Sequence, residues 1–277
     1  MIEAMRRSVS SVTPDDLRAK VRVKAPLSRL LGPGLDLFLE RGYSPEVCLE
    51  SWHLDRLDPT ALAGLAGTLG RAGLVPTLHG PFVGLDPGAP DRLDRDLAER
   101  YFEAALRAAR TLRPVTAVFH GGSLIAVTMD EKARWLDASL PLWTRLARAL
   151  TDLGCTLAVE NVVDGDPEFL LPLVQAVAGE GGGWCFDIGH RQVFGTAGLD
   201  RWLEVLGPHL VHLHLHDNFG GRDDHLPLGR GSIDLARVFQ GLAGLDTVDE
   251  PTATLEVDYR HGVEESLEIL ADLWPWA

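Results

Sequence analysis

Histidine, aspartate and glutamate residues lie at or near the ends of several short apolar runs. The six that carry most weight are His79, His120, Glu160, Asp187, His214 and Glu256, and Glu50 closes the second run. Histidine, aspartate and glutamate side chains, in a group that contains no cysteine, are typical ligands of Zn, Mn and Fe ions. If these residues gather at one place, their carboxylates would repel one another and lose hydration unless cations neutralised them, so we expect a metal site.

The alternation of side chains along a strand predicts which of these residues share a face. In LVHLHLH, the residues His212, His214 and His216 point to one side, stacked from the interior toward the mouth. We expect His212 to be a hydrogen-bonded core histidine. His216 and Asp217 are expected to orient the metal ligands.

Two loop motifs add candidate ligands. His190 follows Asp187 by three residues in CFDIGH, so both side chains can reach the same rim. Asp223 and His225 are two residues apart, which places both on one side of an extended chain and suits chelation. These motifs therefore predict a larger metal centre than the strand ends alone.

The elements that must position these residues alternate along the chain. Amphipathic stretches with apolar residues at three- and four-residue spacing, typical of helices, separate the apolar runs. We read strands at 21–25, 46–50, 75–79, 116–120, 156–160, 183–187, 210–216 and 252–257. Eight strands, each followed by a helical segment, predict an α/β fold, a (β/α)8 TIM barrel, with an open doubly wound sheet as the alternative. Polar residues at strand C-terminal ends are then active-site candidates.

The chain shows no internal linker, so we expect one domain. Residues 21–277 would form the barrel, and residues 1–20 an N-terminal extension of uncertain order. We find neither a signal peptide nor an apolar run of about 18 residues, which a membrane span needs. Three separated cysteines fit a reducing compartment, so we expect a soluble, cytoplasmic protein.

The motifs TLHGP, VFHGGS, AVENV, FDIGH, HLHDN, RDDHLPLGRGSI and TLEVD together resemble the xylose isomerase-like TIM barrels. This superfamily holds sugar isomerases, sugar epimerases and endonuclease IV (AP endonuclease family 2). The resemblance covers about His79 to Glu256 and is closest to the endonuclease IV pattern. It implies two or three divalent ions per chain, with Glu160 bridging two of them. The implied ligands are His79, His120 and Glu160 for one ion, Glu160, Asp187, His214 and Glu256 for a second, and His190, Asp223 and His225 for a third.

The resemblance leaves two enzymatic functions open. The first hypothesis is hydrolysis of a small phosphoester by a water activated between clustered ions. The alternative is a sugar or sugar-phosphate isomerase or epimerase that uses one metal, with Glu160 and Glu256 as the acid–base pair. Gly220 stands where the epimerases place an arginine, and no lysine follows Lys132, which favours hydrolysis. A non-catalytic metal-binding barrel is the third possibility.

A small anionic molecule is the expected substrate. Trp52 and His53 could line the mouth of the pocket. The candidate phosphate contacts are Lys24, Arg191, Arg222 and Arg230. Endonuclease IV's first-strand motif and DNA-intercalating residues have no counterpart here.

The charge balance supports a small substrate. Forty Asp and Glu residues against 26 Lys and Arg residues give a formal net charge of -14. Such a surface repels phosphate backbones and anionic lipid headgroups, so we expect no membrane partner and consider nucleic acid a poor one. The oligomeric state is left open.

Overall fold

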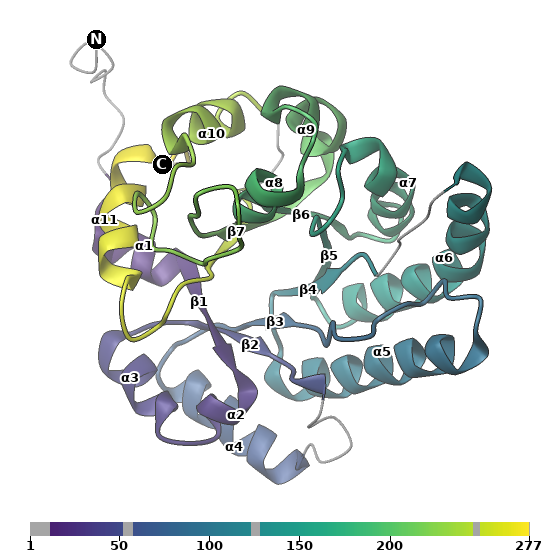
Figure 1. The fold of residues 1–277 in the computed structure, drawn as a ribbon. Helices are drawn as coiled ribbons and strands as arrows, with labels where there is room; N and C mark the ends of the chain where they lie inside the picture. The colour runs from purple at the N-terminus through teal and green to yellow at the C-terminus, as the bar shows by residue number, and fades with distance from the viewer. Residues whose placement is uncertain (1–11, 52–57, 123–127, 246–249, 277) are drawn as a thin grey trace.

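The structure is a computed structural model that describes residues 12–51, 58–122, 128–245 and 250–276. Within these residues, parallel strands pair in chain order, and the last, β8 (Thr252–Leu255), pairs with the first, β1 (Val21–Pro26). The barrel is therefore closed, with helices around its outside (Figure 1). Closure confirms the predicted TIM barrel and excludes the open sheet.

The strands lie close to their predicted positions. The other six are β2 (Pro45–Cys48), β3 (Thr77–His79), β4 (Thr116–His120), β5 (Thr156–Glu160), β6 (Gly183–Asp187) and β7 (Leu210–Leu215). The main difference is that strands 2, 7 and 8 end one or two residues earlier than expected. Glu50, His216 and Glu256 thus lie just past strand ends, at the barrel mouth.

The strand register brings predicted ligands side by side. His120 pairs with Glu160 across β4 and β5, and Asp187 pairs with His214 across β6 and β7. Parallel strands present their C-terminal ends to one rim. The barrel topology therefore gathers residues that are far apart in sequence.

Helices follow the strands and bury their apolar faces against the barrel. The amphipathic stretch after β3 forms α5 (Arg92–Leu112), whose alanines at 98, 105 and 109 are buried. The other helices are α2 (Leu27–Leu30), α3 (Gly34–Arg41), α4 (Pro59–Arg71), α6 (Met129–Thr151), α7 (Pro167–Ala178), α8 (Ile188–Phe194), α9 (Leu199–Leu206), the 3-10 turn η3 (Gly207–His209), α10 (Leu235–Leu242) and α11 (Val263–Leu273).

Part of the predicted N-terminal extension is ordered. Residues 14–20 form helix α1 (Pro14–Lys20), which Thr13 and Asp16 cap reciprocally. Leu17 is fully buried in the main core, and Arg18 pairs with Glu264 at 2.6 Å. This helix packs beside α11 (Figure 1).

The barrel interior has an apolar floor beneath the predicted ligands. Val118, Ala158 and Cys185 form a small buried cluster inside the strands. Val118 and Ala158 lie two residues before His120 and Glu160, so each shares a face with its ligand. The larger core lies outside the strands, against the helices. Among the described residues, no helix combines the length and the apolar character that crossing a membrane requires.

Candidate metal centre

Glu160, at the end of β5, lies at the centre of the predicted ligands. Its Oε2 is 3.3 Å from Nε2 of His79 and 3.5 Å from Nε2 of His120. Its Oε1 is 2.9 Å from Nδ1 of His190 and 3.3 Å from Nδ1 of His214. A carboxylate with both oxygens facing separate groups of histidines is well placed to bridge two cations.

His214 joins a second group through one ring nitrogen. Its Nδ1 is 3.2 Å from Oε1 of Glu256 and 3.7 Å from Oδ2 of Asp187, besides its contact with Glu160. Its Nε2 points the other way and lies 3.3 Å from Oε1 of Glu46. A histidine that contacts a carboxylate through one nitrogen and faces the cluster with the other is in the usual arrangement of a metal ligand.

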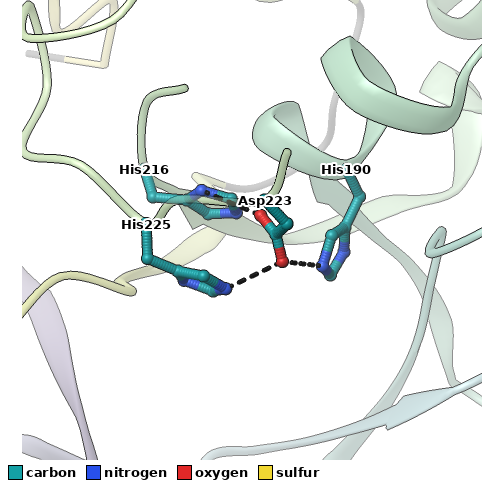
Figure 2. A group of neighbouring side chains, drawn as sticks. All are labelled: His190, His216, Asp223 and His225. Atoms are coloured by element: carbon teal, nitrogen blue, oxygen red, sulfur yellow. Dashed lines mark hydrogen bonds and ion pairs between the residues drawn. The ribbon is translucent and has the colours of Figure 1, made fainter. Parts of the chain in front are cut away.

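A third group forms beside the first two, as Figure 2 shows. Oδ2 of Asp223 lies 3.3 Å from Nε2 of His190 and 3.0 Å from Nε2 of His225. His216 also faces Asp223, with its Nδ1 3.7 Å from Oδ1. All nine ligands implied by the resemblance therefore lie together at the barrel mouth.

Opposite charges stabilise the ionised carboxylates of this cluster. Burial alone would raise the pKa of Glu160, but His214 and His120 outweigh it and hold that pKa well below its usual range. Burial would lower the pKa of His190, yet Asp187, Asp223 and Glu160 raise it to about 12. The buried acids thus require positive charge, which protonated histidines or bound cations can supply.

The cluster also fits metal ions through its unsatisfied atoms. Among the described residues, the buried side-chain atoms without a hydrogen-bond partner include Nε2 of His79, Nδ1 of His214, both carboxylate oxygens of Glu160, and Oε1 of Glu256. Buried polar atoms are rarely left unpaired. These nitrogen and oxygen donors face one another within reach of shared cations, and His, Asp and Glu without Cys suit Zn, Mn or Fe.

The loop that carries Asp223 and His225 is held by Asp217. Oδ2 of Asp217 accepts hydrogen bonds from the backbone N–H groups of Gly229 and Gly231, and its Oδ1 accepts one from Ile233. A Cβ on Gly231 would lie 2.3 Å from that carboxylate, so glycine is required. Asp217 therefore shapes the loop, which differs from the predicted role of orienting a ligand directly.

His216 and His212 have the roles expected of them. Nε2 of His216 donates to Asp187 at 3.1 Å, which orients that carboxylate. The two ring nitrogens of His212 bond the hydroxyls of Thr252 and Thr254 at 2.5 and 3.1 Å. His212 is thus a satisfied core histidine.

Glu46 is a functional candidate that the sequence analysis missed. It lies fully buried in β2, contacts His214, and accepts hydrogen bonds from Thr77 and Thr254 at 3.1 and 2.9 Å. The sequence pattern had pointed to Glu50 in this strand, but Glu50 instead accepts a hydrogen bond from the backbone N–H of Ser28. The sequence signal that could have identified Glu46 was the alternation of side chains along a strand, because residues 46, 48 and 50 point to the same face.

A mainly apolar cavity of about 500 Å³ opens beside the cluster. Glu256 and His225 form its border with the metal centre, and Phe82 lines it from the loop after β3. Lys24 of β1 also lines it and pairs with Glu256, with Nζ 2.7 Å from Oε2. The volume suits a small molecule placed against Glu256.

Of the four predicted anion contacts, Lys24 alone is among the described residues that line this cavity. Arg222 pairs with Asp224, and Arg230 pairs with Glu265 at 2.7 Å, both at the exposed surface. Arg191 is partly buried and donates to Gln192. Trp52 and His53 lie outside the described residues. The three arginines are therefore engaged elsewhere.

Comparison with known proteins identifies the family of this chain. The family model for the xylose isomerase-like TIM barrel matches residues 43–273. TTHB071 protein from Thermus thermophilus, solved after soaking with ZnCl2, is 33% identical, with 93% of this chain and 99% of that chain covered and a TM-score of 0.74.

Two further relatives extend the comparison. A D-tagatose 3-epimerase-like protein has a TM-score of 0.75 at 23% identity, over 92% of this chain and 96% of that chain. The uncharacterized protein MJ1311 of Methanocaldococcus jannaschii is 26% identical over 81% of this chain and 80% of its own length. The fold and family are shared, while the identity to the epimerase-like protein supports the fold alone.

Proposed function

Because the chain belongs to the xylose isomerase-like TIM barrel family, we propose that it is a metal-dependent isomerase or epimerase of a sugar or sugar phosphate. This places second the hydrolysis that the sequence analysis put first. Epimerisation by proton transfer is served by two groups that can exchange protons with carbon from opposite faces, next to a site that holds a carbonyl compound. The epimerase-like neighbour shares the fold that would carry it.

The arrangement of Glu160 and Glu256 is the observation that carries the proposal. Both carboxylates approach Nδ1 of His214, at 3.3 and 3.2 Å. Glu256 also lines the cavity, so a substrate there would meet one member of the pair directly. Asp187 completes the set of two glutamates, an aspartate and a histidine that one metal ion would need.

The two glutamates would move the proton. One carboxylate removes the proton from the carbon next to the carbonyl, and the electron pair passes into the carbon–carbon bond and onto the carbonyl oxygen. The other carboxylate, once protonated, returns a proton to carbon, to the opposite face in epimerisation. A bound divalent ion would polarise the carbonyl oxygen.

Lys24 and the apolar wall would position the substrate. The ammonium of Lys24 beside Glu256 favours the ionised carboxylate, which is the form that accepts a proton. Phe82 stacks on His120 with ring centroids 4.6 Å apart and lines the cavity. A small polyhydroxy substrate, neutral or anionic, suits a cavity that is apolar with a lysine at its edge.

Phosphoester hydrolysis remains a second candidate because all nine ligands implied by the endonuclease IV resemblance lie together. A hydrolase also needs contacts to phosphate oxygens. Arg222 and Arg230, two of the predicted contacts, pair with carboxylates at the surface instead. This difference favours the isomerase proposal.

Solvent deuterium exchange separates the two functions. The protein, loaded in turn with Zn, Mn and Fe, would be incubated in D2O with a panel of ketoses and ketose phosphates. We expect deuterium at the carbon beside the carbonyl, and we expect Glu256→Gln to abolish its incorporation. Release of phosphate or alcohol from phosphoesters, without any deuterium incorporation, would contradict the isomerase proposal and support hydrolysis.

A further inference from the structure

The third group of ligands contains one more residue than the resemblance implied. His190, Asp223 and His225 were expected to hold a cation with three protein atoms. His216 lies in the same group, and the candidate ligand atoms of all four residues are within 4.8 Å of one another (Figure 2). This fourth side chain changes what the site can do.

We propose that His190, His216, Asp223 and His225 form a closed, four-ligand zinc site that clasps the loop after β7 to the barrel. Four protein ligands in a tetrahedron are typical of structural zinc, whereas catalytic zinc keeps a position open for water or substrate. The inference goes beyond the proposed function, because this ion would not contact the substrate.

His216 is oriented as a ligand, with one nitrogen bound and the other facing the group. Its Nε2 donates to Asp187 at 3.1 Å, so the lone pair is on Nδ1. That Nδ1 is fully buried, has no hydrogen-bond partner among the described residues, and faces Asp223. A carboxylate behind a histidine fixes the ring and strengthens the opposite nitrogen as a ligand.

The other two histidines show the same division. Nδ1 of His225 donates to the backbone oxygen of Glu256 at 2.8 Å, which leaves Nε2 toward Asp223. Nδ1 of His190 lies 3.2 Å from the backbone oxygen of Asn161, and its Nε2 likewise faces Asp223. Three histidine nitrogens thus point toward the Asp223 carboxylate, and each can bind a cation once it has lost its proton.

The spacing of the donor atoms suits one zinc ion. At about 2.0–2.1 Å from zinc, the corners of a tetrahedron lie about 3.4 Å apart. Oδ2 of Asp223 lies 3.0 and 3.3 Å from Nε2 of His225 and of His190, and its Oδ1 lies 3.7 Å from Nδ1 of His216. These three distances are close to the edge of such a tetrahedron.

Glycine makes room for the fourth ligand. A Cβ at Gly189, the second residue of α8, would lie 2.0 Å from Cε1 of His216, which is too close for two carbon atoms that are not bonded. The His216 ring also stacks on His225, with centroids 4.1 Å apart and an angle of 14°. The packing around His216 thus limits the movement of its ring.

The clasp would connect α8, the end of β7 and the loop that borders the cavity. His190 belongs to α8, His216 follows β7, and Asp223 and His225 belong to the loop. His225 has a left-handed backbone with φ of 49°, which is uncommon outside glycine, and it lines the cavity. A zinc ion here would fix one wall of the substrate cavity from outside it.

Zinc stoichiometry tests the proposal without reference to activity. Zinc-loaded wild type, His216→Asn, His225→Ala and the exposed-surface control His261→Ala would be dialysed against a weak chelator and assayed for zinc. We expect His216→Asn and His225→Ala each to lose one equivalent per chain, and His261→Ala to keep the wild-type number. The proposal is wrong if His216→Asn keeps that number while His225→Ala loses one.

Anomalous diffraction of the zinc-loaded wild type tests it without any variant. We expect a zinc peak bound by the four side chains, with Nδ1 of His216 in the coordination sphere and no water. A peak with water or an anion in place of His216, or no peak at this group, would overturn the clasp. Either result is independent of whether the protein isomerises sugars, which the deuterium experiment decides.

Discussion

The two sides of the barrel mouth are built differently. The metal side consists of strand-end residues such as Glu160 and Asp187, which are fully buried and in contact with the histidines around them. The cavity side consists of β1, the loops after β2 and β3, and the segment after β8, and it is mainly apolar. Strands fix the positions of side chains closely, while loops vary more freely, so we expect the chemistry on the metal side and substrate choice on the cavity side.

The charges on the two sides are also satisfied differently. On the metal side, several carboxylate and imidazole atoms have no hydrogen-bond partner among the described residues. On the cavity side, Arg260 pairs with Asp258 at 3.0 Å and Lys24 pairs with Glu256. Substitutions on the metal side should therefore change metal binding and catalysis, and those on the cavity side should change substrate affinity.

The largest effect is expected from Glu160→Gln. This substitution removes a negative charge that lies within 3.5 Å of four histidines, His79, His120, His190 and His214, and with it a group proposed to exchange protons. We expect loss of at least one metal equivalent per chain and a fall in turnover of about 10²–10⁴-fold. Metal analysis and steady-state kinetics on the metal-loaded protein would measure both.

Glu265→Gln is the control for that variant, since Glu265 pairs with Arg230 at the surface. It should keep the metal content and the activity of the wild type. An active Glu160→Gln variant with full metal content would break the distinction between the two sides.

The next largest effect is expected from Glu46→Gln. Glu46 contacts Nε2 of His214 and would increase the affinity of Nδ1 for a cation. Loss of such a partner typically weakens metal binding by about 10–100-fold. Chelator competition would measure the affinity, with Glu50→Gln as the control. Equal affinities in the two variants would contradict a role for Glu46.

The pH dependence of metal binding should follow from His190. Its pKa of about 12 in the metal-free protein means that it carries a proton at neutral pH. A metal ligand must be deprotonated, so binding releases that proton and is favoured by rising pH. We expect affinity to increase about tenfold per pH unit for each proton released. Calorimetry in two buffers of different ionisation enthalpy would count the protons, and none released would contradict the assignment.

The metal side could be predicted from the sequence and the cavity side could not. The alternation of side chains and the strand-end positions of residues such as His120 and Glu160 identified the candidate ligands, because both follow from local pattern. Glu46 was missed because it is the first residue of the predicted strand 46–50, and only polar residues at the C-terminal ends of strands were taken as candidates. The pairing of Lys24 with Glu256 depends on β8 closing against β1, which no local pattern contains.

The fourth ligand shows the same limit at a single residue. Alternation placed His216 on the same side as His214, and it was expected to orient a metal ligand, without a prediction of which one. The environment of its Nδ1 depends on the loop after β7, which brings Asp223 next to it. Asp217 holds that loop by accepting a hydrogen bond from the backbone N–H of Gly229. Tertiary contacts of this kind decide the coordination number, and they are set by loop geometry.

The smallest effect is expected on the cavity side, from Phe82→Ala. Phe82 is 42% exposed, lines the cavity and stacks on His120. A contact between the Phe82 ring and a bound substrate would contribute about 0.5–1.5 kcal/mol. Its loss corresponds to a rise of about two- to tenfold in KM, with kcat and metal content unchanged. Phe194→Ala is the matched control, because Phe194 is similarly exposed at 38% and also contacts a predicted metal ligand, His190, but is not among the described residues that line the cavity. Equal KM values for the two variants, or a fall in kcat for Phe82→Ala, would show that the two sides do not divide the work in this way.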